Sequence, residues 1–491
     1  MRVTIVGGGT VGLCTAVFLA RQGVSVHVLE RRGEVNDHPR AFGLTDRSAE
    51  ILREAGFELN TAEFARGLMS GPSLDALTAV TNKFERPEIG PAKLGSCPQD
   101  LVDRAAVTLL RGLGGRVDFD SEVVAVAEDG SVTTADGRVV PGDYVIGADG
   151  IRSKVRALLG IGVTGPGAIG RSHMLNVLFR ADLPAPPLSM TFLRNERASG
   201  ILYRVDEHGR WIFHIPNGDP KSPAEQIKQQ IRDATGVTDA EPEIISQLPW
   251  SPTAHVADVF RKDKFFLVGD AAHAVPPVGG FGLNMGIADG HNLAWKLATG
   301  GDALLDTYEA ERRPVAIFSM KQSVIRSENH NLHWNNDPAL AADRAAVGMA
   351  GIMIPVVGYR YDSAAVIDPE PLPDMENLVL DGSPGSRLPH IWLRDGRSTI
   401  DLVNGFTLLT GTAADHWLDA ARKLGITAHA VEGWATAAGI KEDGAVLIRP
   451  DGFVGWRTVT TAAAPSSEQQ LREARDRILC RPVPSDLGQG V

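Results

Sequence analysis

Residues 2–30 read RVTIVGGGTVGLCTAVFLARQGVSVHVLE, and this stretch decides the fold. A short β-branched run over residues 2–6 leads into the glycine-rich turn 7–12. An apolar helical stretch follows, and then a second strand that ends at Glu30. The order strand, tight turn, helix, strand predicts a parallel βαβ unit.

The spacing of the glycines in this turn has a physical reason at each position. Gly7 permits the turn, Gly9 lets the backbone approach a pyrophosphate, and Gly12 lets the helix pack closely on the strand. The free N–H groups and positive dipole at the start of the helix, around Val11, then meet the phosphates. Glu30 can accept hydrogen bonds from a ribose diol. We therefore predict dinucleotide binding, because a purely structural glycine turn would leave Glu30 unexplained.

Length and composition bound the class of protein. The chain has 491 residues, too many for one ordinary core, so we expect two or three domains. Apolar residues make up 43% and charged residues 22%, which is typical of a soluble globular protein. The formal charge of -11 argues against nucleic acid or an anionic membrane as a partner. No run of about 18 or more apolar residues occurs, so we expect no membrane span.

The N-terminus and the cysteines indicate the compartment. The apolar N-terminus is interpreted as the first strand and not as a signal peptide, because its glycines and helix are needed for the fold. Cys14, Cys97 and Cys480 lie far apart and form no C-x-x-C pair. We therefore expect neither a disulfide framework nor a metal site, and a cytoplasmic location.

Beyond residue 30 the pattern changes several times. Apolar periodicity predicts helices over residues 48–55, 97–110, 153–159, 222–235, 284–298 and 304–327. Alternating runs over residues 116–119, 123–128, 131–134 and 138–140 predict a small antiparallel meander. Strand-like runs between residues 170 and 250 predict an antiparallel sheet in a separate lobe. Buried strands end at Gly147 and at Gly269-Asp270. Residues 362–388, rich in Pro, Asp and Gly, look like a linker before an α/β tail.

Three distant segments together resemble one family. They are residues 7–30, then Gly147-Ala148-Asp149-Gly150 with Ser153 and Arg156, then Gly269-Asp270 with Pro276-Pro277 and residues 279–284. In this order they resemble the single-component FAD-dependent aromatic hydroxylases, the para-hydroxybenzoate hydroxylase-like family. Within it the chain looks most like the aromatic polyketide, rifampicin and phenol hydroxylases of secondary metabolism. The tail is similar to that family's thioredoxin-like domain in Arg449-Pro450-Asp451-Gly452, but it lacks C-x-x-C, so we expect no redox activity from it.

The resemblance implies an α/β fold with a Rossmann-like FAD-binding domain, an inserted antiparallel β substrate lobe and a C-terminal thioredoxin-like domain. The expected boundaries are residues 1–75, 97–168 and 258–361 for the FAD-binding domain, 76–96 and 169–257 for the lobe, 362–387 for the linker and 388–491 for the C-terminal domain. Because a linker separates the tail, we expect removal of residues after about 385 to spare flavin binding.

The resemblance also assigns cofactor roles residue by residue. The ADP half of FAD would be held by Gly7, Gly9, Val11, Gly12 and Glu30, with Arg31 beside them. Its sugar and phosphates would meet Arg40 and Gln99, and its adenine the backbone of Val123. Asp149, with Gly150, belongs to a segment that serves both FAD and NADPH, and Asp270 would accept from the ribityl chain. The flavin ring would lie along Pro277, Gly279, Gly280, Gly282, Leu283 and Asn284.

Several of these assignments have a structural alternative. Asp270 stands at the carboxyl end of a strand, where ligands bind, but can also cap the next turn. The amides before the helix at Leu283 can stabilise negative charge on the ring, whereas an ordinary Pro/Gly loop is the alternative. Asp149 can be a turn aspartate before glycine. Arg40 can be a solvated loop arginine.

The activity implied by the resemblance is an NADPH- and O2-dependent monooxygenation. NADPH reduces the non-covalently bound FAD, O2 adds at flavin C4a, and the distal oxygen of the hydroperoxide goes to an electron-rich aromatic ring. The substrate would be a small polycyclic phenolic or polyketide-type molecule. No second G-x-G-x-x-G domain is evident for NADPH, and the family likewise lacks one and binds NADPH transiently. We expect a monomer or homodimer.

The lobe should roof the substrate pocket. Its candidate lining residues are Met190, Phe192, Tyr203, Trp211 and Phe213, with core packing as the alternative for each. Strand alternation puts Trp211 and Phe213 on one face and His214 on the other. His214 can be a general base for a phenol, but a surface or satisfied histidine is the commoner case. For His273 we favour a structural hydrogen bond. Phe281 stands where many relatives have glutamine, and no essential acid or base is assigned.

Other functions stay open at this point. The same flavin chemistry supports Baeyer–Villiger oxygen insertion, which the sequence does not separate from hydroxylation. A flavin halogenase is more distant, because the second Trp of its Trp-x-Trp-x-Ile-Pro pattern is replaced by Phe213. A non-catalytic flavin- or ligand-binding protein is the alternative from another class.

Overall fold

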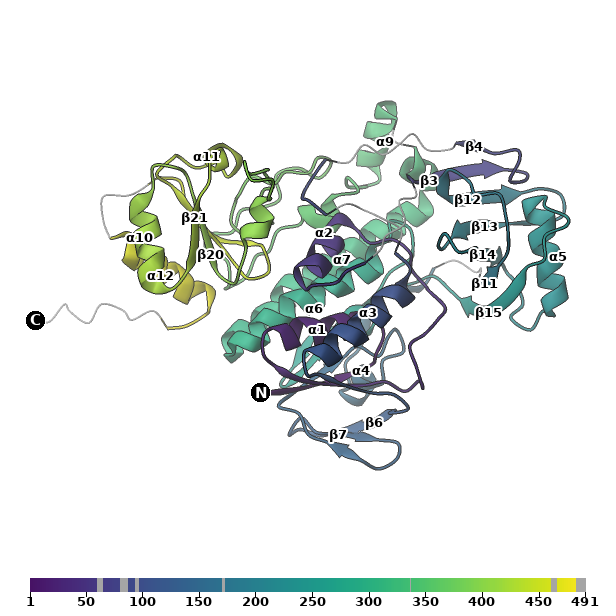
Figure 1. Ribbon diagram of the computed structural model, residues 1–491, viewed down its shortest axis with the longest axis horizontal. Coiled ribbons are helices and arrows are strands. Elements are labelled where there is room, and N and C mark those ends of the chain that lie inside the picture. The colour runs from purple at the N-terminus through teal and green to yellow at the C-terminus, as the bar shows by residue number, and fades with distance from the viewer. Residues whose placement is uncertain are drawn as a thin grey trace, which may run out of the picture.

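The computed structural model describes residues 1–59, 65–79, 87–92, 97–169, 173–335, 337–460 and 466–482. Figure 1 shows three parts side by side, with the longest helices in the middle one. We call the middle part the N-terminal domain (residues 1–59, 97–169 and 253–361). The part on the right is the lobe (residues 65–79 and 173–252), and the part on the left is the C-terminal domain (residues 388–482). None of the helices within the described residues combines the length and apolar character that a membrane crossing requires.

The N-terminal domain is built on a six-stranded sheet of order β17-β18-β9-β1-β2-β5. Its strands are β1 (Arg2–Val6), β2 (Ser25–Leu29), β5 (Arg116–Asp118), β9 (Tyr144–Gly147), β17 (Arg261–Lys262) and β18 (Phe265–Leu267). All pairs are parallel except β17 with β18. β1, β9 and β18 are almost wholly buried, as is typical of parallel strands covered by helices. The predicted βαβ unit over residues 2–30 is confirmed.

Most of the described helices belong to this domain. They are α1 (Thr10–Arg21), α2 (Asp46–Glu54), α3 (Gln99–Gly112), α4 (Lys154–Leu158), α6 (Phe281–Thr299) and α7 (Asp302–Glu328), followed by α8 (His330–Trp334), α9 (Ala341–Ala346) and the short turns η2 (Pro338–Leu340) and η3 (Ile354–Gly358). α1 is buried nearly all round because it lies between α3 and α6. A Cβ on Gly286 would lie 2.5 Å from Cγ2 of Val11, so only glycine lets α6 approach α1 this closely.

Two small antiparallel sheets complete the N-terminal domain. One holds β6 (Val123–Val126), β7 (Val132–Thr134) and β8 (Val139–Val140), and the other holds β10 (Val163–Ala168), β16 (Thr253–Ala257) and β19 (His273–Ala274). The predicted meander therefore has only its last three strands. Residues 116–118 instead form β5, which pairs in parallel with β2, because a strand that follows a crossover helix joins the sheet from which that helix departed.

The lobe is one seven-stranded sheet of order β15-β11-β14-β13-β12-β3-β4. Its strands are β3 (Ala65–Gly71), β4 (Thr78–Ala79), β11 (Met174–Arg180), β12 (Leu188–Arg194), β13 (Ser199–Arg204), β14 (Arg210–Pro216) and β15 (Glu243–Trp250), with helix α5 (Ala224–Thr235). All pairs are antiparallel except β12 with β3. Residues 65–71, which we assigned to the FAD-binding domain, thus lie in the sheet of the lobe. Part of the expected segment 76–96 lies outside the described residues.

One face of the lobe sheet is covered by α5, on the side away from the N-terminal domain (Figure 1). Ile227 and Ile231 of α5 pack there against Val177, Trp211 and Phe213. The opposite, inner face turns toward the N-terminal domain, where the ring of Phe42 lies 5.3 Å from that of Tyr203.

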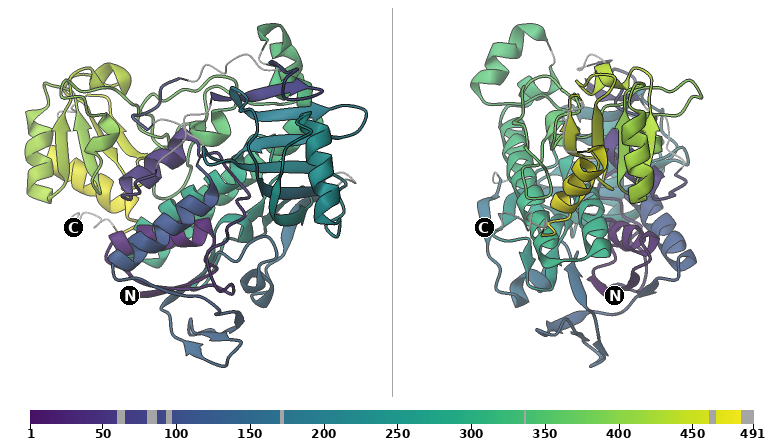
Figure 2. Two further views of the ribbon diagram at one scale, coloured as in Figure 1. Left: turned by 45° about the vertical axis from the view of Figure 1, so that its right-hand side comes forward. Right: turned by 90° about the vertical axis from the view of Figure 1, so that its left-hand side faces the viewer.

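The C-terminal domain has the element order βαβαββα. Its elements are η4 (Thr399–Leu402), β20 (Thr407–Thr410), α10 (Asp415–Leu424), β21 (Thr427–Ala430), α11 (Trp434–Ala437), β22 (Ala445–Ile448), β23 (Val454–Thr458) and α12 (Ser467–Ile478). The sheet order is β21-β20-β22-β23, with β20 and β21 parallel and the other pairs antiparallel. This is the thioredoxin-like arrangement that the resemblance implied. Figure 2 shows α2, in purple, between this domain and the rest of the N-terminal domain.

The segment before the C-terminal domain is tied to both of its neighbours. Ser363 donates to Oε1 of Glu311 on α7 at 2.7 Å. The amide of Ile367 donates to the carbonyl of Gly455 at 2.9 Å, beside β23. Residues 362–387 therefore pack against both domains.

Candidate functional site

The three sequence motifs converge on one place in the N-terminal domain. A Cβ on Gly7 would collide with the carbonyl of Ala148 and lie 2.9 Å from Cα of Asp149. A Cβ on Gly269 would lie 3.0 Å from Cγ1 of Val11. The glycine turn thus touches both later motifs, because the parallel strands β1, β9 and β18 all end at the same edge of the sheet.

Two helices begin at this edge with glycine instead of a capping side chain. α1 starts after Gly9, and α6 starts after Gly280. Among the described residues, no side chain caps either helix, and the first turn of each helix contains no acidic residue. A Cβ on Gly9 or Gly280 would meet nothing within 4 Å. Two sets of free backbone N–H groups therefore face open space, which is the arrangement that binds negatively charged groups.

Glu30 lies at the end of β2, as predicted, and is nearly buried. Its carboxylate accepts from the amide of Gly8 at 2.6 Å and from the amide of Arg32 at 2.9 Å. Its carbonyl accepts from the amide of Ser121 at 2.8 Å, which brings the segment before Val123 to the same place. Glu30 therefore ties the glycine turn to the neighbouring loop, and Arg31 beside it is exposed.

Arg40, Gln99 and Asp270 are brought together from three distant positions. The amide of Arg40 donates to Oε1 of Gln99 at 3.2 Å. Both Arg40 and Asp270 remain accessible to solvent. Desolvation by the surrounding protein nevertheless raises the pKa of Asp270, with the charge of Arg40 acting in the opposite direction, and it also lowers the pKa of Arg40. The exposed carboxylate of Asp270, at the carboxyl end of a parallel strand, can therefore accept hydrogen bonds from a ligand.

The Gly269-Asp270 turn is held from below by Asp289, a residue that the sequence reading missed. Oδ2 of Asp289 accepts from the amide of Gly269 at 3.1 Å and lies 2.6 Å from Nε2 of His273. Oδ1 accepts from Nε of Arg312 at 2.8 Å. Burial alone would raise the pKa of Asp289, but His273 and Arg312 lower it, so the carboxylate is ionised. The signal was the single acid in α6, on a helix that is buried along most of its length. The contact also gives His273 the structural bond that we favoured.

Asp149 and Asn284 use their side chains within the protein. Asp149 accepts from the hydroxyl of Ser153 and from the amides of Lys154 and Val155, at 2.6 and 3.0 Å for the amides, so it holds the start of α4. Oδ1 of Asn284 accepts from the amide of Thr45 at 2.8 Å, and its Nδ2 donates to the carbonyls of Gly43 and Gly280. Any ligand contact of these two residues would therefore come from the backbone.

The loop before α6 leaves an accessible surface. Pro277 and Gly280 are exposed, and Gly279, Gly282 and Leu283 are half-exposed. The amide of Gly280 donates to the carbonyl of Pro277 at 2.9 Å and closes the turn. Phe281, which stands where many relatives have glutamine, is buried, and the guanidinium of Arg326 lies 5.5 Å from the centre of its ring. Its side chain therefore points away from the exposed side of the loop.

The strand register decides which lobe residues face the N-terminal domain. Met190, Phe192 and Tyr203 are half-buried on the inner face, where we expected a pocket lining. Trp211 and Phe213 point the other way. They are 3% and 1% exposed and pack under α5. These two residues therefore belong to the core of the lobe and do not line a pocket on the inner face. The alternation was predicted, but the sequence does not say which face of a sheet a helix will cover.

Two histidines lie on the inner face. His214 of β14 has its ring 4.8 Å from that of Tyr203. His38, from the loop after β2, reaches across to the lobe, and its Nδ1 lies 2.6 Å from the hydroxyl of Ser246 on β15. Sequence reading missed His38, because nothing in the chain order places residue 38 beside residue 214.

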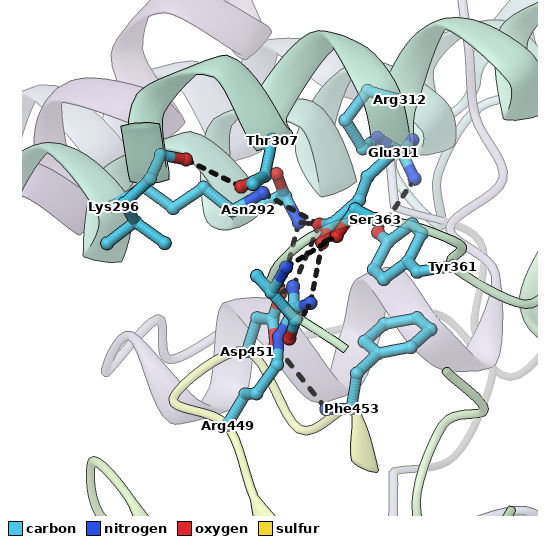
Figure 3. A network of polar contacts seen from close by, with 12 residues as sticks. Asn292, Lys296, Thr307, Glu311, Arg312, Tyr361, Ser363, Arg449, Asp451 and Phe453 are labelled. Atoms are coloured by element: carbon cyan, nitrogen blue, oxygen red, sulfur yellow. Dashed lines mark hydrogen bonds and ion pairs between the residues drawn. The ribbon is translucent and has the colours of Figure 1, made fainter. Parts of the chain in front are cut away.

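A buried charge network joins the C-terminal domain to the N-terminal domain (Figure 3). Arg449 donates to Glu311 of α7 and to Asp451 of its own loop, and Lys296 of α6 donates to Glu311 at 2.7 Å. Asn292 of α6 donates to Asp451 at 3.0 Å. All four charged side chains are excluded from solvent. The Arg-Pro-Asp-Gly segment is therefore an interdomain contact.

The network is held in its charged form. Burial alone would raise the pKa of Glu311, but the positive charges of Arg449 and Lys296 lower it instead. Burial lowers the pKa of Lys296 to about 8 in spite of Glu311, so the ammonium stays charged at neutral pH. The lowered pKa of Glu311 and the lowered pKa of Lys296 are both consistent with an ionised Lys296–Glu311 pair, because Arg449 binds the same carboxylate as Lys296.

Comparisons with known proteins agree with this architecture. A family described as FAD binding domain matches residues 1–323, and one described as aromatic-ring hydroxylase, C-terminal, matches residues 381–482. Tetracenomycin B2 monooxygenase-dioxygenase of Streptomyces olivaceus is 35% identical, with 98% of each chain covered. Aklavinone 12-hydroxylase RdmE of Streptomyces purpurascens is 33% identical, with 97% of this chain and 99% of the relative covered.

Solved structures give the same result. The ternary complex of aklavinone-11 hydroxylase with FAD and aklavinone superposes with a TM-score of 0.83 at 31% identity, covering 98% of this chain and 99% of that one. The flavin-dependent monooxygenase PieE in complex with FAD and substrate also has a TM-score of 0.83, at 29% identity, covering 98% of this chain and 100% of that one.

Proposed function

The chain belongs to the single-component FAD-dependent aromatic hydroxylases, and from that premise we propose that it uses NADPH and O2 to hydroxylate a polycyclic phenolic or polyketide-type aromatic substrate. Its named relatives act on tetracenomycin and aklavinone compounds. The observation that carries the proposal is the meeting of two uncapped helix starts with Asp270 and Arg40 at one sheet edge.

The residues at that edge fit FAD. A pyrophosphate would bind the N–H groups at the start of α1, with Arg31 and Arg40 supplying positive charge. Glu30, with the backbone near Val123 and Gln99, would hold the adenosine, and Asp270 would accept from the ribityl hydroxyls. Gly9 and Gly280 leave the space that a cofactor would fill, since a Cβ there would meet nothing within 4 Å.

Bound FAD supplies the redox chemistry, activating O2 with electrons from a nicotinamide and delivering one oxygen atom to the substrate. The protein's part is binding and orientation. The amides at the start of α6 would stabilise negative charge on the ring, and the loop Pro277–Leu283 would lie along it. The lobe would cover the site and exclude water, with Met190, Phe192 and Tyr203 against the substrate.

The reductant and the domain roles belong to the same proposal. We infer NADPH as the reductant from the family and from the Asp149-Gly150 segment. The carboxylate of Asp149 accepts from the amides of Lys154 and Val155 at the start of α4, so the backbone of this segment would contact the ligand. We assign FAD binding to the N-terminal domain, substrate binding to the lobe and a structural role to the C-terminal domain. The working unit would be a monomer or a homodimer.

The test is a turnover assay on the purified FAD-loaded chain. NADPH and O2 should be consumed slowly alone and faster with an added polycyclic phenol, and 18O from O2 should enter the product. NADH serves as the competing reductant, light scattering gives the mass in solution, and NMR of the product separates ring hydroxylation from insertion beside a carbonyl. A protein that binds no flavin, or that oxidises NADPH without oxygenating any aromatic offered, would overturn the proposal.

A further inference from the structure

Two histidines on the inner face of the lobe sheet each have a ring nitrogen that lacks a hydrogen-bond partner among the described residues. His38 is 6% exposed and His214 is 9% exposed. In both rings the buried, unpaired atom is Nε2. A buried polar atom without a partner destabilises the folded protein, so such atoms in native structures call for an explanation. A ligand atom that completes the bond is one such explanation.

Both rings are held in place by their surroundings. Nδ1 of His38 lies 2.6 Å from the hydroxyl of Ser246, which fixes the plane of that ring. The ring of His214 lies between those of Tyr203 and Trp250, with centroid distances of 4.8 and 5.9 Å. Trp250 is held in turn, because its Nε1 donates to Oδ1 of Asn176 at 2.6 Å. Both rings are therefore fixed in orientation by their neighbours.

The strand register puts both histidines at the same face. His214 pairs with Asn176 of β11, and Ser246 pairs with Leu178, two residues further along the same strand. Residues two apart on a strand point to the same side of a sheet, so the anchor of His38 shares the face of His214. The two rings are also close enough that charge on His38 lowers the pKa of His214.

The protonation of the pair restricts what it can bind. Burial lowers the pKa of His38 to about 4 and that of His214 to about 3. Both rings are therefore neutral at pH 7, and Nε2 of a neutral imidazole either donates or accepts according to its tautomer. A hydroxyl group both donates and accepts, so it can satisfy one nitrogen of each kind. An ether or a carbonyl oxygen can only accept.

We propose that Nε2 of His38 and Nε2 of His214 together bind a phenolic hydroxyl of the aromatic substrate and so orient its ring on the inner face of the lobe. The inference rests on the proposed function and adds to it the residues that select a hydroxylated ring. They are binding residues that set which ring position faces the cofactor, and no proton transfer is assigned to them.

The experiment compares two matched ligands on the FAD-loaded full chain. The dissociation constants of 2-hydroxyanthraquinone and 2-methoxyanthraquinone are measured by calorimetry for the natural protein and for His38→Leu, His214→Leu and His214→Gln. His208→Leu, an exposed histidine between β13 and β14, is the matched control. We expect the natural protein and the control to prefer the phenol by about tenfold or more, because sites built to bond a hydroxyl discriminate strongly against analogues without it.

Each leucine variant should lose that preference while binding the methyl ether as before. His214→Gln should recover part of it, because the glutamine amide also carries a donor and an acceptor. An unchanged preference in both leucine variants would overturn the inference, and the proposed function would stand if those variants still oxygenate the phenol. A protein that binds neither ligand and oxygenates no aromatic would instead refute the proposed function.

Discussion

Nη1 of Arg449 lies 2.6 Å from Oε1 of Glu311, although the two residues belong to different domains and are 138 positions apart in the chain. Neither side chain is exposed to solvent. Glu311 is adjacent to Arg312, which bonds Asp289 beneath the Gly269-Asp270 turn. The C-terminal domain is therefore joined, through charged groups inside the protein, to the helix that supports the candidate flavin site.

Replacing Arg449 by methionine should strongly destabilise the protein. Glu311 and Asp451 would be left buried with one cation fewer, and breaking a buried ion pair costs about 3–5 kcal/mol. Chemical denaturation measures this loss. The matched control is Arg394→Met, because Arg394 pairs with Glu432 on the exposed surface of the same domain and should leave the midpoint unchanged. Equal effects of the two substitutions would contradict the interdomain role of the network.

Removing residues after about 385 should abolish flavin binding, the reverse of the expectation drawn from the linker composition. The truncated chain would uncover Asn292, Lys296 and Glu311 on α6 and α7, and it would take away Arg387, which bonds Glu50 of α2. Of these helices, α2 follows the loop that carries Arg40, and α6 follows the loop that carries Gly280. Flavin absorbance after gel filtration measures the outcome, and a truncated protein that remains folded and yellow would show that the C-terminal domain is dispensable.

Asp270→Ala should lower FAD occupancy by about tenfold or more, because a buried ligand hydroxyl would lose its charged acceptor. The ratio of flavin to protein absorbance after gel filtration gives the answer. Asp239→Ala removes an exposed carboxylate of the lobe and serves as the control. If both variants retained the same flavin content as the natural protein, Asp270 would have no role in holding the cofactor.

The two faces of the lobe sheet should respond differently to substitution. Phe213→Ala should destabilise the protein by about 3–5 kcal/mol, since it opens a cavity under α5. Phe192→Ala, on the half-buried inner face, should change the unfolding midpoint little and raise KM for the aromatic substrate. Thermal melts and steady-state kinetics test the pair together. An increase in KM for Phe213→Ala without loss of stability would place the substrate on the outer face.

Stability should fall as the pH rises toward neutrality because of Asp103 on α3. Burial, with the nearby charges of Asp100 and Glu30, raises its pKa to about 7. The unfolded chain releases this proton above about pH 4, so the folded state loses stability between about pH 4 and pH 7. Asp103→Asn mimics the protonated form and should raise the unfolding midpoint at pH 8 more than at pH 5. Equal gains at the two pH values would exclude this titration.

The sequence by itself determined the parts of this protein that follow from local pattern. Residues 2–30 specified a βαβ unit, because alternating and helical periodicity with glycines at fixed spacing leave few other solutions. The glycine turn and the Gly-Asp strand end fixed the candidate cofactor site, since parallel strands bring their carboxyl ends to one edge. The alternation of strands and helices after residue 388 predicted an α/β tail, and its thioredoxin-like character came only from the family resemblance.

Only the tertiary structure decided which faces and charges meet. The alternation along β14 separated Phe213 from His214, but the packing of α5 made one face core and left the other turned toward the N-terminal domain. His38 came to the sheet face that carries His214 through its contact with Ser246, and Arg449 came beside Glu311, and no local pattern encodes either contact. Local pattern reflects the spacing of side chains along one helix or strand. The contacts between distant residues depend instead on how separate helices, strands and loops pack against one another in the interior.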